Sequence, residues 1–292
     1  MKKPGFVDLH SHSTASDGTD APAAVIRLAA AAGLSAISLT DHDTIGGLDA
    51  ASLEAANVGI DFLPGIEISC SYPRPGTMHL LGYGIDPASE SLGRVLTSLI
   101  EARNERNLRI VEQLQKQGIG ITMEDVIRAS GGGVVGRPHI ARVLLDRGAV
   151  KTSAEAFNKY LGGGAKNYID KERLTASEAI RLIHDAGGLV SLAHPSQLKR
   201  QNRLQLQHAI KDLADMGLDA VECIHSDHRD SYVDDLEELS RRYGLLTTGG
   251  SDYHGAAKRH IRLGFARERR IPREWFDRLQ SAVLAKRQGQ RV

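Results

Sequence analysis

The chain has 292 residues, of which 41% are hydrophobic and 25% are charged, and its formal net charge at pH 7 is only +1. This composition excludes a disordered chain, and the near-neutral charge excludes a general electrostatic attraction to nucleic acid. The length suits one large α/β domain or two small ones.

Cysteine content and apolar segments bear on the cellular compartment. Cys70 and Cys223 are the only cysteines, which is too few for a disulfide framework, and their apolar neighbours predict core positions. The opening residues, Met1–Gly5, contain no apolar signal segment, and no apolar run reaches about 18 residues. We therefore expect a cytoplasmic protein that does not associate with membranes.

Strands and helices alternate in the first ninety residues and again after residue 169. Strands are predicted at 6–9, 36–39, 62–68, 78–83, 189–193, 220–224 and 245–248, and helices at 21–32, 48–56, 177–186, 204–216 and 230–243. This alternation is typical of a parallel α/β fold. A barrel that collects the strand ends on one face is its most economical form.

The alternation stops between these two stretches. Helices are predicted at 91–117, 122–129, 137–146 and 153–161, and no convincing strand occurs before Tyr168. We predict that residues 91–168 form a helical insertion that caps the barrel. The barrel itself would then consist of residues 1–90 and 169–292.

Polar side chains gather at the predicted strand ends. His10 and His12 follow the first strand at a spacing of two, so both imidazoles point to the same side of an extended backbone. The full set is His10, His12, Asp17, His42, Glu67, His79, His194, Asp252 and His254. Six imidazoles and three carboxylates exceed what one ion needs, so we expect two or three divalent metals.

Each of these residues has a structural alternative. Asp17 before Gly18 would serve in a turn, Asp41 and Asp43 would cap a helix, and His194 would be a core histidine. No single structural explanation covers all nine residues of the set, so the metal hypothesis is preferred.

Five short motifs occur in order along nearly the whole chain: Asp-Leu-His-Ser-His (8–12), Thr-Asp-His-Asp (40–43), Gly-Ile-Glu-Ile-Ser (65–69), Ala-His-Pro (193–195) and Gly-Ser-Asp-Tyr-His (250–254). This set of motifs resembles that of the PHP (polymerase and histidinol phosphatase) family. The long helical insertion and the segment around Tyr160 look like the stand-alone phosphoesterase branch of that family. This branch includes a nucleoside 3′,5′-bisphosphate phosphatase and a 5′-to-3′ exoribonuclease.

The resemblance implies a distorted (β/α)7 barrel with a trinuclear metal site. By motif matching, the first metal would take His10, His12, Glu67 and Asp252; the second Glu67, His79 and His194; and the third Asp17, His42 and His254. Nitrogen and oxygen donors without cysteine fit manganese, zinc or iron, with manganese the first expectation.

Charge counting favours a phosphate substrate independently of the family. Three divalent ions bring six positive charges, and three carboxylates and a bridging hydroxide remove four, which leaves a positive pocket. A metal lowers the pKa of its bound water from about 15.7 to about 7, so metal-bound hydroxide would be the nucleophile. Asp252 would accept the proton of that water. His225 and His228 would contact the leaving group, act as general acids, or only line the rim.

Substrate-binding residues are predicted from two positions. Gly136-Arg137-Pro138-His139 opens a helix, so a phosphate would meet Arg137, His139 and the helix N-terminus together; the alternative is that Arg137 is a solvated surface residue. Family relatives carry a Gly-Arg pair after His-Pro, whereas here Ser196 and Gln197 follow, so Lys199 and Arg200 are expected to replace it.

The expected function is a metal-dependent phosphohydrolase that acts on a small phosphorylated molecule, most simply a nucleotide such as a nucleoside 3′,5′-bisphosphate. One alternative is a phosphodiesterase or 5′-to-3′ exoribonuclease acting on short oligonucleotides or cyclic phosphates. The low aromatic content of 4% weighs against long nucleic acids. The remaining alternatives are a histidinol-phosphate phosphatase and a non-catalytic module, which would have lost metal ligands. The sequence does not indicate an oligomeric state.

Overall fold

The structure is a computed structural model that describes residues 5–73, 75–170 and 172–289. Within these ranges eight strands form one sheet in the spatial order β7-β6-β5-β4-β3-β2-β1-β8. They are β1 (Phe6–Asp8), β2 (Leu34–Leu39), β3 (Asp61–Cys70), β4 (Met78–Tyr83), β5 (Leu189–Leu192), β6 (Ala220–His225), β7 (Leu246–Gly250) and β8 (Ile271–Pro272). Residues 1–4, part of the opening segment without an apolar signal, lie outside the described residues.

Seven strands follow one another around the sheet in chain order, and one of them runs backwards. β1, β2 and β3 are parallel, and so are β5, β6 and β7, whereas β4 is antiparallel to both β3 and β5. The prediction of a parallel sheet is therefore wrong for β4. The connection 71–77 is too short for the crossover that a parallel pair requires. Because β4 is reversed, His79 near its start pairs with Ser69 near the end of β3.

The sheet curls until β1 and β7 meet. The backbone N–H of Leu9 donates to the carbonyl of Gly249 at 3.1 Å, and that of Asp252 donates to the carbonyl of His10 at 2.9 Å. Gly250 makes this approach possible, because a Cβ there would lie 2.3 Å from the Cβ of His10. The expected distorted (β/α)7 barrel is confirmed, with β8 added antiparallel to the edge of β1.

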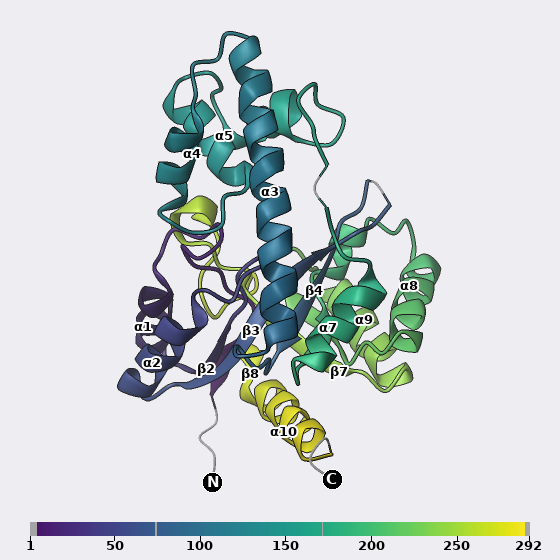
Figure 1. The fold of residues 1–292 in the computed structure, drawn as a ribbon. Helices are drawn as coiled ribbons and strands as arrows, with labels where there is room; N and C mark the ends of the chain where they lie inside the picture. Colours follow the sequence, from purple (N-terminus) through teal and green to yellow (C-terminus); the bar gives the residue numbers. More distant parts are fainter. Residues whose placement is uncertain (1–4, 74, 171, 290–292) are drawn as a thin grey trace.

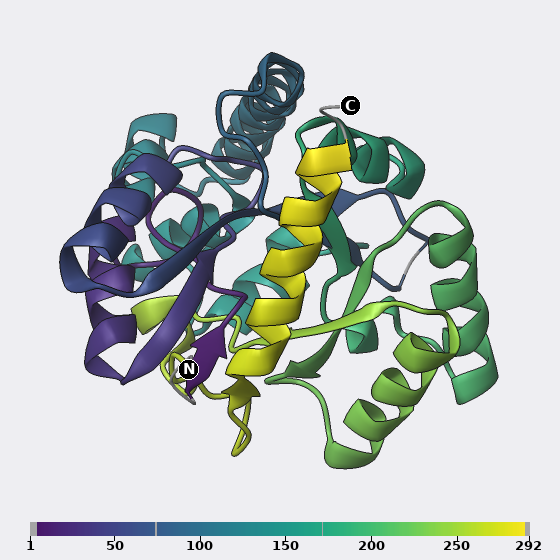
Figure 2. The same ribbon diagram turned by 90° about the horizontal axis from the view of Figure 1, so that it is seen from below.

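Helices cover the outside of the barrel (Figure 1). They are α1 (Pro22–Ala31), α2 (Leu48–Val58), α7 (Ala176–Asp185), α8 (Arg203–Asp215), α9 (Asp230–Arg242) and α10 (Arg273–Gly289). The last of these is absent from the sequence prediction. Its buried Phe276, Leu279 and Val283 recur at helical spacing as a narrow stripe among charged residues. Seen from below, α10 lies across the end of the barrel (Figure 2).

A group of helices projects beyond the other end of the barrel (Figure 1). It contains α3 (Glu90–Lys116), α4 (Met123–Ser130), α5 (Arg137–Asp146), α6 (Ser153–Ala156) and a π-helical turn (Phe157–Leu161). α3 joins the two parts, because Leu92 and Leu96 belong to the barrel core while Ile110 and Leu114 belong to a separate apolar cluster with α4 and α5. The cap boundaries at residues 91 and 168 stay a prediction. None of the described helices has the length and apolar character of a membrane span.

Candidate metal centre

All nine predicted ligands come together at one end of the barrel. They lie in the segment after β1, after β2, on β3, at the start of β4, after β5 and after β7. Their possible donor atoms fall into overlapping groups of three or four residues, with all atoms of a group within 4.8 Å of one another. The reversed β4 is what brings His79 into this set.

The first donor group combines residues that follow β1, lie on β3 and follow β7. It consists of His10 Nε2, His12 Nε2, Glu67 Oε2 and Asp252 Oδ1, and the five separations that describe it run from 3.1 to 3.6 Å. Four donors about 2.1 Å from a tetrahedral metal lie roughly 3.4 Å apart. The donor set therefore fits a divalent ion in both chemistry and spacing.

Glu67 connects this group to a second one. Its Oε1 lies 2.8 Å from His79 Nδ1 and 2.9 Å from His194 Nε2, while its Oε2 faces the first group. Burial alone would raise the pKa of Glu67, but the surrounding imidazoles hold it well below the usual range. The two oxygens of an ionised carboxylate thus face different donor groups, as a bridging ligand requires.

A third, looser group is centred on Asp17. The Oδ1 of Asp17 lies 3.3 Å from His254 Nε2 and 3.9 Å from His12 Nδ1, and its Oδ2 lies 4.0 Å from His42 Nε2. His42 also places its Nδ1 3.1 Å from Glu67 Oε2, so it stands between two groups. The division of the ligands among three individual metals therefore stays a prediction.

Glu222 and Asp8 support the ligands and were not predicted as site residues. Glu222 is fully buried; its Oε1 lies 2.9 Å from His10 Nδ1, and its Oε2 accepts the N–H of His194 at 2.6 Å. Burial alone would raise the pKa of Glu222, but His10 and then His225 lower it to about 2. Asp8 accepts the N–H and hydroxyl of Ser251. The sequence signal for such a supporting carboxylate is an acidic residue within a buried strand, as Glu222 is within Ala220–His225.

Asp41 and Asp43 do not cap a helix, so that alternative is wrong; α2 begins only at Leu48. Asp41 accepts bonds from the backbone and hydroxyl of Ser13 at 2.8 and 2.6 Å and so holds the loop that follows His12. Asp43 pairs with Arg103 of α3. These two carboxylates therefore fix the ligand loop and tie the cap to the barrel.

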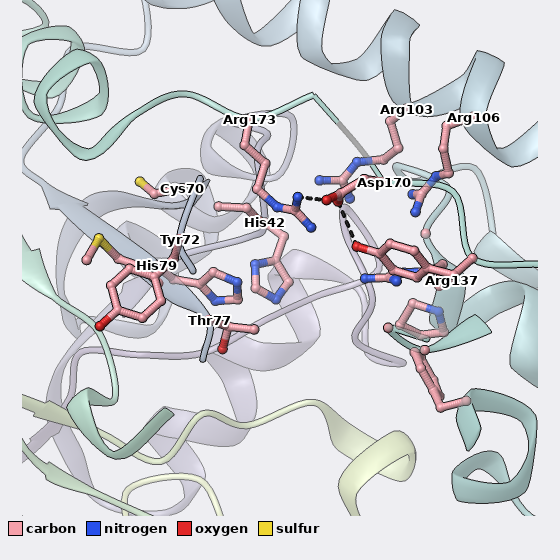
Figure 3. A pocket seen from close by; sticks show the side chains of 18 of the residues that line it. His42, Cys70, Tyr72, Thr77, His79, Arg103, Arg106, Arg137, Asp170 and Arg173 are labelled. Atoms are coloured by element: carbon pink, nitrogen blue, oxygen red, sulfur yellow. Dashed lines mark hydrogen bonds and ion pairs between the residues drawn. The ribbon is translucent and has the colours of Figure 1, made fainter. Parts of the chain in front are cut away.

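A cavity of about 720 Å³ leads from the metal centre to the cap. Its barrel end is lined by Asp17, His42 and His79. Its cap end carries four arginines, which we call the arginine wall: Arg103, Arg106, Arg137 and Arg173. Figure 3 shows His42 and His79 side by side, with Arg103, Arg106 and Arg137 gathered on the other side of the cavity.

The arginine wall is crowded with positive charge. Arg106 is buried, and its Nε has no hydrogen-bond partner among the described residues. Burial, together with the charges of Arg137 and Arg103, lowers the pKa of the Arg106 guanidinium. A bound anion would reduce the repulsion between these guanidinium charges. Arg103, Arg106 and Arg173 were missed by sequence reasoning because they come from elements that carry no motif.

The predicted substrate-binding residues do not share one cavity. Arg137 lines the cavity described above, donates to the carbonyl of Leu161 at 2.9 Å and stands over the ring of Tyr168. His139 instead accepts the N–H of Gly136 through Nδ1 and lines a second cavity. The structure thus places the two side chains in neighbouring cavities, and their joint contact with one phosphate stays a prediction.

Lys199 and Arg200 follow the short helical turn that begins after His194. Lys199 ends the short turn Pro195–Leu198, and the guanidinium of Arg200 stands 5.2 Å from the ring centre of Tyr72, a residue of the cavity wall. Neither cation lines the two cavities described here. The role of both residues in substrate binding stays a prediction.

His225 and His228 are both buried beside the ligands. The His225 ring lies 5.9 Å from that of His10 and 5.4 Å from that of His194. His228 lies behind it, with ring centres 5.2 Å apart. Cys70 and Cys223 are both buried, and burial raises the pKa of Cys223, as expected of core residues.

A nearly closed barrel that gathers histidines and carboxylates at one end has the architecture of a metal-dependent hydrolase. The model of the PHP domain matches residues 8–222, and the chain belongs to the PHP family. It is a metal-dependent phosphoester hydrolase.

Named relatives support this placement. The chain is 36% identical to a 3′,5′-nucleoside bisphosphate phosphatase of Chromobacterium violaceum, covering 85% of this chain and 87% of that protein. It is 34% identical to the 5′-3′ exoribonuclease Rnm of Salmonella typhimurium, covering 85% and 84%. It is also 32% identical to a phosphoribosyl 1,2-cyclic phosphate 1,2-diphosphodiesterase of Eggerthella lenta, covering 88% and 97%.

Solved structures agree with the fold. A proposed metal-dependent phosphoesterase from Bifidobacterium adolescentis superposes with a TM-score of 0.83 at 30% identity, covering 95% of this chain and 96% of that one. An amidohydrolase from Chromobacterium violaceum, with bound sulfate and no metal, gives a TM-score of 0.81 at 34% identity, covering 94% and 96%.

Proposed function

We propose that the protein removes one phosphate from a nucleotide that carries a second phosphate, such as a nucleoside 3′,5′-bisphosphate. The observation that carries the proposal is the cavity that joins the metal centre to the arginine wall. One phosphate would lie at the metal centre while the other meets the wall. The similarity to a bisphosphate phosphatase supports the same choice.

Two to three divalent ions, with manganese as the first candidate, are the proposed cofactor. When bound, they would supply a water of lowered pKa and neutralise charge on the phosphoryl oxygens. Asp252 can take part as an ionised carboxylate: burial alone would raise its pKa, but His254, His12 and Lys258 hold it well below the usual range. Its Oδ1 faces the ligand histidines, and its Oδ2 accepts a bond from Lys258 at 2.6 Å.

The arginine wall would recognise the second phosphate through charge-assisted hydrogen bonds. Arg106 and Arg137 are the best placed, because Arg103 and Arg173 already pair with Asp43 and Asp170. The ring of Tyr168 also lines this part of the cavity and would offer an apolar face to the sugar or base.

A second cavity favours a second candidate function, hydrolysis of short oligonucleotides from a phosphorylated 5′ end. This cavity, of about 1140 Å³, shares Asp17 and His42 with the first and lies between the cap and the loop after β7. Arg142, Lys258 and Arg259 line it. A chain longer than one nucleotide would continue there, past the metal centre, with its backbone beside these cations.

The test compares kcat/KM, with manganese present, for four substrates of increasing size. These are 4-nitrophenyl phosphate, a nucleoside 5′-monophosphate, a nucleoside 3′,5′-bisphosphate and a 5′-phosphorylated trinucleotide. A charge-assisted bond contributes about 1.5–3 kcal/mol, so the bisphosphate is expected to exceed the monophosphate roughly 10- to 150-fold. Equal values for those two substrates would contradict the proposal, and the highest value for the trinucleotide would favour the second candidate.

A further inference from the structure

His225 and His228 have opposite hydrogen-bonding patterns. The Nδ1 of His228 lies 2.8 Å from the carbonyl oxygen of Cys223, so this nitrogen must donate. The Nδ1 of His225 instead accepts the backbone N–H of Asp227 at 3.0 Å. A ring nitrogen that accepts a hydrogen bond uses its lone pair, so the proton of the neutral His225 imidazole sits on Nε2.

This pattern separates His225 from the candidate ligands. His10 donates through Nδ1 to Glu222 and His254 donates through Nδ1 to the carbonyl of Asp252, which leaves each Nε2 lone pair free for a metal. His225 belongs to a possible donor group with His10 and Asp252. A nitrogen that bears a proton has no lone pair to give, so proximity alone does not make this residue a ligand.

We propose that His225 is a positioning residue that donates its Nε2–H to Oδ2 of Asp252 and thereby leaves Oδ1 for the metal. The two atoms are 3.5 Å apart, which a small rotation would shorten to a hydrogen bond. His225 Nε2 is buried and has no hydrogen-bond partner among the described residues. Lys258 Nζ already lies 2.6 Å from the same Oδ2, while Oδ1 faces His10 Nε2 and His12 Nε2.

Asp252 needs such support because its backbone is strained. It has a φ of +60°, in the left-handed region that residues other than glycine rarely adopt. Two donors on one carboxylate oxygen would fix the side chain in the orientation that offers the other oxygen. The inference rests on the metal-binding part of the proposed function and is independent of which phosphorylated substrate is cleaved.

The protonation state of His225 does not alter this assignment. Burial alone would lower its pKa, but the carboxylates of Glu222 and Asp252 outweigh burial and raise it. Neutral His225, with Nδ1 accepting from Asp227, and the imidazolium both carry a proton on Nε2. Only the tautomer protonated on Nδ1 alone lacks that proton, and the N–H of Asp227 opposes it.

The first test is a histidine ring ¹⁵N NMR spectrum of the intact wild-type protein loaded with zinc, which is diamagnetic. We expect His225 Nε2 to keep its attached proton in the loaded protein, while His10 Nε2 and His254 Nε2 carry none. A His225 Nε2 that has no proton after zinc loading would overturn the inference. This measurement requires no variant and no substrate.

The second test uses His225→Ala and His225→Gln, with His10→Gln as the control for a true ligand. His225→Ala should bind the full number of zinc equivalents, but with one site about 10- to 100-fold weaker, as loss of a supporting partner does. The amide of His225→Gln can still donate near the Nε2 position and should restore the affinity. Loss of one whole equivalent in both variants, as expected for His10→Gln, would make His225 a ligand. A wrong choice of substrate would leave all these readouts unchanged.

Discussion

The metal centre and the arginine wall lie in the same cavity but are built in different ways. The candidate ligands stand on strands or just beyond strand ends, and buried carboxylates such as Glu222 hold them. The wall instead combines α3, α5 and the segment that leads back to the barrel. Its long side chains come from elements far apart in the chain. The comparison suggests that the barrel determines the chemistry and the cap determines the substrate.

The two regions also differ in charge balance. In the metal centre, carboxylates alternate with imidazoles at distances near 3 Å, so most donors already face an opposite partner. In the wall, guanidinium groups crowd one another, and the Nε of Arg106 has no partner among the described residues. Damage to the first region should therefore affect all substrates alike. Damage to the second should affect only substrates that bring an extra anion.

The largest expected effect is that of removing the metals. We expect the purified protein, grown with added manganese, to hold two to three equivalents of divalent metal, and chelation to abolish hydrolysis of every substrate. Elemental analysis before and after dialysis against a chelator, followed by manganese addition, measures both. One equivalent or none in the active protein would contradict the multinuclear centre.

A single variant then divides the centre. Motif matching assigns His42 to the looser group around Asp17, so His42→Ala should remove one equivalent and leave the others in place. The exposed Arg94 on α3 provides the control, because Arg94→Ala should retain the full metal content. Loss of all metal in His42→Ala would show that the ligands do not divide among the ions as motif matching implies.

The next largest effect is expected from Asp252→Asn. The change keeps the side-chain shape but removes the charge that faces the ligand histidines and Lys258. We expect kcat to fall at least about 100-fold on every substrate, within the range for loss of a general acid–base group. Steady-state kinetics should be paired with metal analysis. Lost activity with full metal content would indicate a proton-accepting role, lost metal would indicate a ligand role, and normal turnover would contradict both.

The difference between the metal centre and the arginine wall also explains which residues could be predicted from the sequence. His10 and His12 are informative because a spacing of two on a strand places both imidazoles on one side, whatever the rest of the fold does. Glu67 and Asp252 stand in short motifs with apolar or glycine neighbours, and the barrel then brings the strand ends together. These candidate positions depend on local periodicity and on the rule that strand ends meet at one end of a barrel. Both can be read from the sequence, so the positions could be predicted.

The arginine wall depends on tertiary packing. Arg103 and Arg106 stand on a long charged helix, where nothing in the sequence distinguishes them from exposed neighbours such as Arg94. Their burial follows from the way α3 leans over the cavity. The surroundings of His139 depend on packing in the same way: close to Arg137 in sequence, it caps its own helix and lines the other cavity. The direction of β4 and the existence of α10 likewise follow from connection length and packing.

The smallest and most discriminating effect is expected from a pair of arginine variants. Arg137 lines the first cavity and Arg142, five residues farther along α5, lines the second. Arg137→Ala should lose a charge-assisted bond of about 1.5–3 kcal/mol to the second phosphate, or roughly 10- to 150-fold in kcat/KM for a nucleoside bisphosphate. It should have little effect on 4-nitrophenyl phosphate, which has no second anion.

Arg142→Ala is the matched control, because it removes the same charge from the same helix. Arg142 is exposed, so its contact with a phosphate should contribute only about 0.2–1 kcal/mol, and its loss should reduce kcat/KM less than about 6-fold. That reduction is expected for a 5′-phosphorylated trinucleotide and not for the bisphosphate. Comparing both variants on all three substrates gives a crossed test of the two cavities. Equal losses for Arg137→Ala on the aryl phosphate and the bisphosphate would place Arg137 at the reacting phosphate or in the scaffold. The cap would then no longer account for substrate choice.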